Sequence, residues 1–370
     1  MKRIGTAVTA ATAALLLAQA PAATAAGTTG WTAPSCTRVT GDGSVTFTTD
    51  EGRTLAPTTG TLHTTGYTHG LVALDTPNVL LATHNTQLLR SADAGCSWTP
   101  LATLGTGTTR LAAAPGGRAY AWQVGGGYLA RIDGTTVTRL TAPTANITGL
   151  GTDRAHPGHL RLADHAGQLF DSTDGGVTWT RTGRPAFPAG SSVYSVAFDP
   201  ADVRHAVAGA MVRGGAVTTD GGTTWTAAKG LTAKGDKANL FSSAVSPADP
   251  SVVYGLGIDL DEAAPGSSSE GRHLYRSADG GRTFVKIVDD SAEIKLTNGT
   301  LLAPSPVDAD VLHFVFGTYF QNYGTDLFRL DARTGRVTKT HNAYDGISAI
   351  AFNPARPQVM YLGADEVRVD

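Results

Sequence analysis

The 370-residue chain repeats the same two local motifs along its length. The first is a turn containing Pro or Asp beside an apolar run, and it occurs at residues 75–78, 115–118, 153–157, 199–202, 246–249, 306–308 and 353–356. The second is a Ser/Thr-x-Asp-x-Gly-x-Thr/Ser-aromatic box, which is complete at residues 91–98, 172–179, 218–225 and 277–284. A period of about 40–50 residues, with strand-like runs between turns, predicts β-sheets repeated around an axis.

The repeat at residues 193–228 shows how one unit is built. Residues 193–198 form a nearly continuous apolar run, which is typical of a strand buried on both faces. A second apolar strand is expected at 205–211, followed by half-polar strands at 216–219 and 223–227. Each repeat is therefore predicted to be a four-stranded antiparallel meander, and such sheets bury their faces by packing on neighbouring sheets.

The box positions and the turns give the same number of repeats. The box aspartates are Asp93, Asp133, Asp174, Asp220, Asp279, Asp331 and Asp370, of which Asp133 and Asp331 lie in degenerate boxes. We therefore predict an all-β fold, a seven-bladed β-propeller of four-stranded antiparallel blades. The last repeat offers strands at 347–352, 359–362 and 366–369 but no fourth, so the stretch 37–56 is predicted to be its missing outer strand and to close the ring.

The N-terminus has the pattern of an export signal. Lys2 and Arg3 precede an apolar stretch at 4–18, and an Ala-x-Ala cleavage pattern follows at 23–25. We predict a signal peptide at 1–26 and a single propeller domain at 27–370, secreted to the extracellular medium; the alternative for the first segment is a buried helix or a membrane anchor. A formal charge of −2 gives no electrostatic case for a nucleic-acid or membrane partner.

The chain has two cysteines, Cys36 and Cys96. An even pair in an exported protein predicts one disulfide, here between the N-terminal stretch and the first repeat. The alternative is a metal-binding or catalytic thiol, but no His or Cys lies at ligand spacing beside either residue.

These boxes and their spacing resemble the Asp-box, or bacterial neuraminidase repeat, β-propellers, and the resemblance covers nearly the whole chain after the signal. It implies that Asp93, Asp174, Asp220 and Asp279 are structural residues in turns on the outer rim. Local turn chemistry agrees, because Asp side chains bond nearby backbone and Gly tolerates positive φ. The alternative role, as catalytic or metal-binding carboxylates, is disfavoured.

Sialidases carry such boxes, but the Arg-Ile-Pro motif of that family is absent here and none of the five glutamates has a matching context. Glycoside hydrolases and polysaccharide lyases with similar blades need two carboxylates across the cleft, and the sequence does not single out that pair. The chain also lacks Gly-x-Ser-x-Gly, His-Glu-x-x-His and phosphate-loop motifs.

In length, export signal and cysteine content the chain is similar to the dispase autolysis-inducing protein family of soil bacteria. That resemblance implies a secreted, non-catalytic, monomeric propeller that binds another extracellular protein and needs no cofactor. The implied partners are a secreted metalloprotease and a transglutaminase, for which the protein is a glutamine donor. The alternative is a carbohydrate-active enzyme or a glycan-binding propeller.

Two loops depart from the minimal repeat and are the candidate sites. One is rich in aromatic and amide side chains, as protein- or sugar-binding surfaces are, and with the next connection it supplies the candidate binding residues Tyr319, Phe320, Gln321, Asn322, Tyr323, His341, Tyr344 and Asp345. For its aromatic residues, a place in the core between blades is an equal alternative. The other loop carries Asp259, Asp261 and Glu262, which are either Ca²⁺ ligands or part of a solvated loop.

Overall fold

The computed structural model describes residues 30–61, 67–232, 237–263, 270–315, 325–343 and 346–365. Within these ranges the regular secondary structure consists of β-strands. In the same ranges, no helix has the length and apolar character needed to cross a membrane. The expected signal peptide at 1–26 lies outside the described residues.

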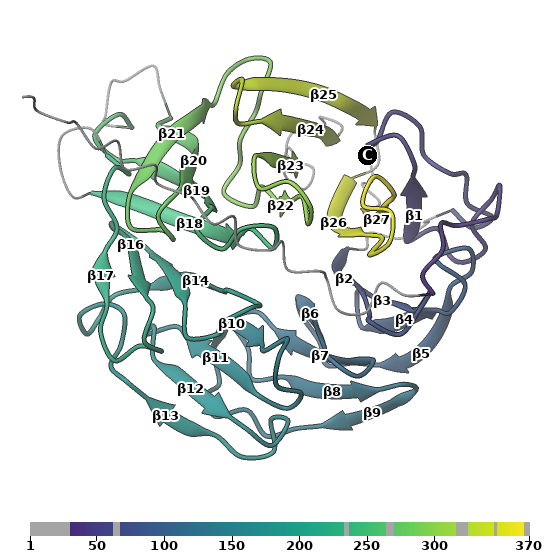
Figure 1. The fold of residues 1–370 in the computed structure, drawn as a ribbon, viewed down its shortest axis with the longest axis horizontal. Coiled ribbons are helices and arrows are strands. Elements are labelled where there is room, and N and C mark those ends of the chain that lie inside the picture. Colours follow the sequence, from purple (N-terminus) through teal and green to yellow (C-terminus); the bar gives the residue numbers. More distant parts are fainter. Residues whose placement is uncertain are drawn as a thin grey trace, which may run out of the picture.

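Antiparallel sheets are set side by side around a common centre (Figure 1). The first three are four-stranded and each follows the chain in order. They consist of β2 (Thr68–Ala73), β3 (Leu80–His84), β4 (Gln87–Ser91) and β5 (Thr99–Thr103); β6 (Thr109–Ala114), β7 (Arg118–Gln123), β8 (Leu129–Asp133) and β9 (Thr136–Arg139); and β10 (Ile147–Thr152), β11 (Leu160–Asp164), β12 (Leu169–Ser172) and β13 (Thr180–Thr182).

The next two units are joined into one sheet by a short parallel pairing of β16 with β18. Their strands are β14 (Val193–Phe198), β15 (Ala206–Ala210), β16 (Arg213–Thr218) and β17 (Thr226–Ala227), then β18 (Ala238–Val245), β19 (Val253–Asp259), β20 (Arg272–Ser277) and β21 (Phe284–Asp289). A further four-stranded sheet holds β22 (Leu302–Pro304), β23 (Val311–Val315), β24 (Thr325–Asp331) and β25 (Arg336–Ala343).

The last sheet combines the two ends of the described chain. It holds β26 (Gly346–Phe352), β27 (Met360–Asp365) and β1 (Val45–Thr48), and β1 pairs antiparallel with β27 from Val45 opposite Gly363 to Thr48 opposite Met360. The N-terminal strand joins the last repeat, as predicted, and it is the edge strand of the described sheet. It pairs directly with the second strand of that repeat, so it stands third and not fourth. The strand predicted at 366–369 lies outside the described residues. A box-like turn follows β1, as the complete boxes follow third strands: the Asp50 carboxylate accepts from the Thr54 backbone N–H at 2.9 Å and from the Thr54 hydroxyl at 2.7 Å.

The first strand of each unit faces the centre, and we call these strands, β2, β6, β10, β14, β18, β22 and β26, the inner strands. Each of the first five packs against the inner strand of the next unit, and β26 packs against β2. In the repeat at 193–228, the predicted first strand matches β14 and the predicted outer strand shrinks to the two residues of β17. The box turn takes up the remaining residues.

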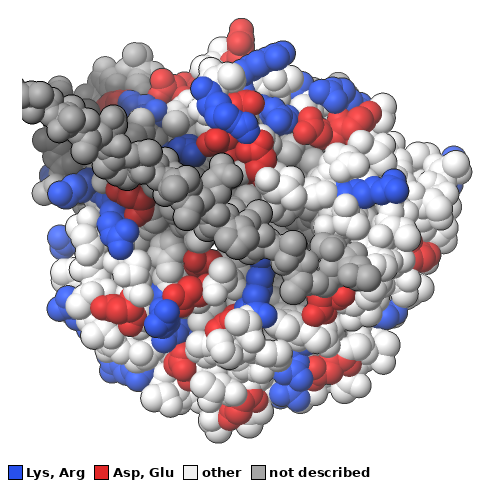
Figure 2. Space-filling model, viewed as in Figure 1, with Lys and Arg blue, Asp and Glu red and all other residues white. Residues whose placement is uncertain are grey.

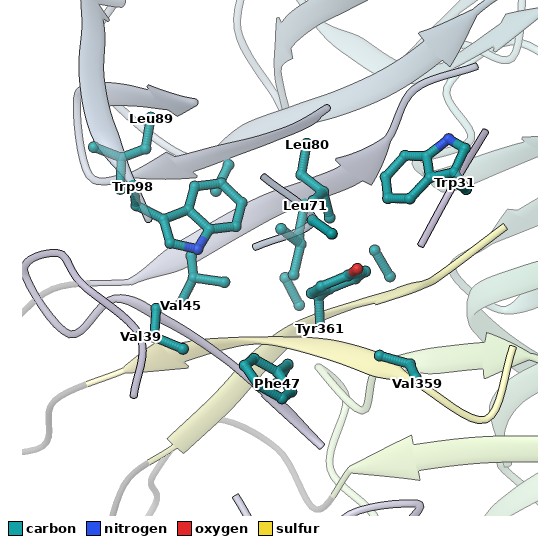
Figure 3. Close-up of a cluster of buried hydrophobic side chains, with 14 residues drawn as sticks. Trp31, Val39, Val45, Phe47, Leu71, Leu80, Leu89, Trp98, Val359 and Tyr361 are labelled. Atoms are coloured by element: carbon teal, nitrogen blue, oxygen red, sulfur yellow. The ribbon is translucent and has the colours of Figure 1, made fainter. Parts of the chain in front are cut away.

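The predicted disulfide is confirmed between Cys36 and Cys96. It fastens the N-terminal segment to the box turn of the first sheet, beside a core cluster built from both ends of the chain (Figure 3). Trp31, Phe47 and Tyr361 are buried there, and the Trp31 indole N–H donates to the carbonyl of Leu74 at 3.1 Å. The N-terminal segment is therefore bound to the first and last sheets by packing as well as by a covalent bond.

Asp220 shows how a box is organised. Its Oδ1 accepts from the Thr224 backbone N–H at 2.9 Å and from the Thr218 hydroxyl at 2.8 Å, while its Oδ2 accepts from the Thr224 hydroxyl at 2.6 Å. The turn between them passes through Gly222 with φ of 89°, a conformation that costs glycine little. The Thr224 hydrogen bonds lower the pKa of Asp220 to about 2. The structural role of the box aspartates stays a prediction, which a substitution tests.

We expect Asp220→Ala to lower the free energy of unfolding by about 1 kcal/mol at neutral pH, because backbone donors lose an acceptor and the site is exposed. The pKa of Asp220 is depressed in the folded state, so its contribution is present above the unfolded value near ~4 and is lost as pH falls toward 2. Denaturant unfolding should therefore show a difference between wild type and Asp220→Ala that shrinks over this pH range. A variant of unchanged stability that has lost partner binding would contradict a structural role.

Candidate functional site

The inner strands all begin at one end of the sheets, and the boxes lie at the other end. In the first sheet, Thr68 at the start of β2 pairs with His84, the last residue of β3. The end of β2 at Ala73 pairs with Leu80, which in turn faces Ser91 of the box. The end where the inner strands begin therefore also carries the turns between second and third strands, and we call it the mouth end.

Bulges near the start of several inner strands place one extra residue there. The register shifts lie between Thr68 and Gly70, Ile147 and Gly149, Val193 and Ser195, Leu240 and Ser242, and Ile347 and Ala349. A bulge bends its strand and changes the direction in which a side chain points. The extra residues are His69, Thr148, Tyr194, Phe241 and Ser348.

A cavity of about 440 Å³ lies between four inner strands, β6, β10, β14 and β18. At the mouth end it is lined by Arg110, Thr148, Ser195 and Ser242. The hydroxyls of Ser195 and Ser242 are buried and have no hydrogen-bond partner within the described protein. Buried hydroxyls are nearly always paired in proteins, so these two are suited to water or to a bound polar group.

Arg110 supplies a positive charge at the mouth end. Its side chain is exposed to solvent and also lines the cavity. The protein atoms around it reduce the hydration of the guanidinium, and this loss of hydration lowers its pKa. No carboxylate of the described chain offsets that effect. Burial, together with Arg110 and His84, lowers the pKa of His69 to about 4, so His69 is neutral at pH 7. An arginine that is partly desolvated and unpaired is suited to an acidic group of a partner.

An aromatic pair lies at the same end of the sheets, near the starts of β14 and β18. The rings of Tyr194 and Phe241 are 5.0 Å apart, and both side chains are half-buried. Aromatic residues and arginine are enriched at the centres of protein interfaces. We call His69, Arg110, Tyr194, Ser195, Phe241 and Ser242 the mouth residues.

The described lining of the cavity contains no aspartate or glutamate. Glycoside hydrolysis normally uses two carboxylates about 5–10 Å apart on either side of the scissile bond. On the face seen in Figure 2, acidic and basic side chains are interspersed, without a large field of one sign. The described lining of this cavity thus lacks such a pair of carboxylates.

The predicted sixth-repeat binding residues are only partly covered. Tyr319, Phe320, Gln321, Asn322, Tyr323, Tyr344 and Asp345 fall outside the described residues. His341 lies in β25, opposite Leu327 of β24, and is half-buried. The aromatics Phe314 and Phe328 are buried and stacked at 5.0 Å, as expected for the core.

The three residues predicted as Ca²⁺ ligands do not share one set of contacts. The Asp259 carboxylate is buried and accepts from the Asp261 backbone N–H at 2.9 Å, whereas Asp261 is exposed. Glu262 is paired with His273 at 2.8 Å and with Lys286 at 2.6 Å. Glu262 is thus held by side chains of β20 and β21, which the spacing of the loop alone does not reveal.

The mouth residues were not identified from sequence. Tyr194 and Phe241 lie inside apolar runs that read as ordinary buried strands, and Arg110 is a lone charge beside Leu111. A one-residue bulge moves a side chain to another face without a signature in the sequence. The one hint in the sequence was Arg110 itself, a charged residue near the start of a mostly apolar strand.

No protein-family model matches the sequence. The chain is 68% identical to the dispase autolysis-inducing protein of Streptomyces mobaraensis over 372 residues, which cover 100% of both chains. Among solved structures it is similar to a GH74 enzyme of Niastella koreensis, with a TM-score of 0.61, 18% identity, and coverage of 82% of this chain and 52% of that one. It is also similar to YCF48 bound to D1 peptide, with a TM-score of 0.57, 12% identity, and coverage of 82% and 95%.

The chain therefore spans about half the length of the GH74 enzyme that it matches. At these identities the two solved structures show the fold alone, which is all-β and propeller-like.

Proposed function

The chain belongs to the family of the dispase autolysis-inducing protein, and we propose that it is a secreted, non-catalytic β-propeller that binds an extracellular protease and promotes its autolysis. The observation that carries the proposal is the 68% identity over the whole of both chains. This similarity extends over the whole of both chains at high identity, whereas the GH74 likeness shows only the fold.

The same proposal covers the finer architecture. We propose seven blades, with the three-stranded sheet of β26, β27 and β1 as the last and the N-terminal strand joining the two ends of the ring. A signal peptide at 1–26, a single domain at 27–370 and a monomeric secreted product complete it. The Cys36–Cys96 disulfide supports export, because disulfides persist mainly in oxidising compartments.

The mouth residues are our proposed centre of the protease-binding surface. Arg110 supplies an unpaired charge and the Tyr194–Phe241 pair supplies aromatic rings at the same end of the sheets, which suits a segment of a folded protein that carries acidic and apolar groups. The sixth-repeat residues 319–323, 341 and 344–345 remain proposed binding residues. We propose that the partner is a secreted metalloprotease and that this chain needs no cofactor to bind it.

A role as a transglutaminase substrate is a further part of the proposal. A donor glutamine must reach the active site of another enzyme, so exposure decides which residue serves. Gln358 is exposed in the turn before β27, whereas Gln168 is buried and its amide donates to backbone carbonyls. We propose Gln358 as the donor among the described glutamines.

The alternative of a carbohydrate-active or glycan-binding propeller rests on architecture alone. The carboxylate-free lining of the described cavity favours protein binding over glycoside hydrolysis.

Mixing the purified secreted protein with active dispase tests the proposal. We expect intact dispase to disappear faster as the protein is added, as followed by gel and by residual activity. The effect should grow with dispase concentration, because autolysis between molecules is bimolecular. Heat-denatured protein is the control. An unchanged lifetime of dispase at equimolar protein would contradict the proposal.

A further inference from the structure

At the end opposite the mouth, the turn between β10 and β11 gathers three side chains with metal-ligating atoms. Asp153 Oδ2 lies 3.0 Å from His156 Nδ1 and 2.8 Å from His159 Nδ1. The three donor atoms all lie within 4.8 Å of one another, and no other described trio of His, Cys, Asp or Glu does so. The sequence predicted this segment only as a turn that connects two strands.

We propose that Asp153, His156 and His159 form a binding site for Zn²⁺ or a similar imidazole-preferring divalent metal ion. Two imidazole nitrogens and one carboxylate oxygen are a ligand set that zinc uses, with the fourth position open to water or to a donor from outside. Asp153 and His159 are largely buried, with side chains 9% and 21% exposed, and His156 is 74% exposed. The site is thus anchored in the protein and open on one side.

The surroundings of His159 support this assignment. Its second nitrogen, Nε2, lies 3.0 Å from Asp171 Oδ1, and Arg161 Nε donates to the same oxygen at 2.8 Å. Histidines that bind metals usually donate their other N–H to a carboxylate, which fixes the tautomer and the ring orientation. His159 is therefore already held with Nδ1 directed toward Asp153 and Nε2 toward Asp171.

The equivalent turn of the next repeat shows what the fold itself needs. There Asp199 Oδ2 pairs with His205 Nδ1 at 3.4 Å, and His205 Nε2 contacts the Gly280 carbonyl at 2.8 Å. One histidine suffices to support that turn, and the position matching His156 is Asp202, which pairs with Arg204. His156 is thus an additional imidazole that the turn geometry does not require.

The charge around the turn is close to balanced before a metal binds. Three carboxylates lie around it, those of Asp153, Asp171 and Asp202. Arg161 donates to Asp171, and Arg204 donates to Asp202. Metal binding would replace the Nδ1 protons that His156 and His159 now share with Asp153. His156 would then carry its proton on Nε2, and His159 would keep its Nε2 proton toward Asp171, so that any excess proton leaves to solvent.

Isothermal titration of the chelator-treated full protein with Zn²⁺ tests the site. We expect one Zn²⁺ per chain, and a loss of affinity of about 10-fold or more in His156→Ala and in Asp171→Asn. His165→Ala is the matched control, because this exposed histidine follows the far end of β11, and it should bind as wild type does. The exposure of His156 makes loss of folding in His156→Ala unexpected, and melting temperatures check this.

Co²⁺ in place of Zn²⁺ supplies a second measurement, since its visible spectrum reports coordination by nitrogen and oxygen ligands. The spectrum should appear in wild type and disappear in His156→Ala. Failure of wild type to bind Zn²⁺, or equal binding by wild type and His156→Ala, would overturn the proposal.

Discussion

Replacing both Cys36 and Cys96 by alanine is expected to lower the free energy of unfolding by about 4 kcal/mol. The disulfide joins residues 60 apart in sequence, and closing a loop of that length restricts the unfolded chain by about this amount. Denaturant unfolding of the double variant and of wild type, each without reductant, measures the difference. Reduced wild type should match the double variant, which separates loss of the bond from loss of packing.

The effect should also be local. Apart from the disulfide, β1 and Trp31 are held to the first and last sheets by pairing with β27, by one core cluster and by hydrogen bonds such as that from Trp31 to Leu74, so this segment should open first when the bond is lost. Hydrogen exchange should therefore rise at Val45–Thr48 more than in β14. Equal stability of the oxidised and reduced proteins would show that packing alone holds the N-terminal segment.

Arg110→Glu is expected to weaken binding to the protease by about 10-fold or more, and to slow protease loss accordingly. The change reverses the charge at the proposed centre of the interface. It should leave the melting temperature almost unchanged, because Arg110 is solvent-accessible and its guanidinium has no carboxylate partner in the described chain. Affinity for catalytically inactivated dispase, measured by surface plasmon resonance, gives the first quantity.

Arg181→Glu is the matched control for Arg110→Glu. Arg181 is exposed on β13, an outermost strand, and the charge change is the same. It should bind the protease as wild type does. Equal weakening by both variants would indicate a general electrostatic effect, and no weakening by Arg110→Glu would place the binding surface elsewhere.

Local sequence patterns predicted the parts of the fold that depend on local chemistry. The apolar run at 193–198 became β14, and the box sequence around Asp220 became a turn held by Thr218 and Thr224, because its hydrogen bonds connect residues at most four apart. The pairing of Cys36 with Cys96 followed from there being only two cysteines in a chain predicted to be exported.

Features that depend on distant residues were missed or misplaced. β1 stands third in its sheet because it pairs with β27, more than 300 residues away, and no local pattern fixes that register. Tyr194 and Phe241 meet because two separate strands carry bulges at matching places. The neighbours of His159 include Asp171 from another strand, so the sequence of the turn alone showed no site.

We propose that this chain acts on a protease by binding and not by catalysis. The most direct test is to incubate the protein with dispase whose own active site has been inactivated, then to follow both by size-exclusion chromatography and mass spectrometry. We expect a complex that contains uncleaved dispase, while active dispase under the same conditions is degraded. Cleavage of the inactivated dispase by the protein alone, or the absence of any complex, would contradict the account.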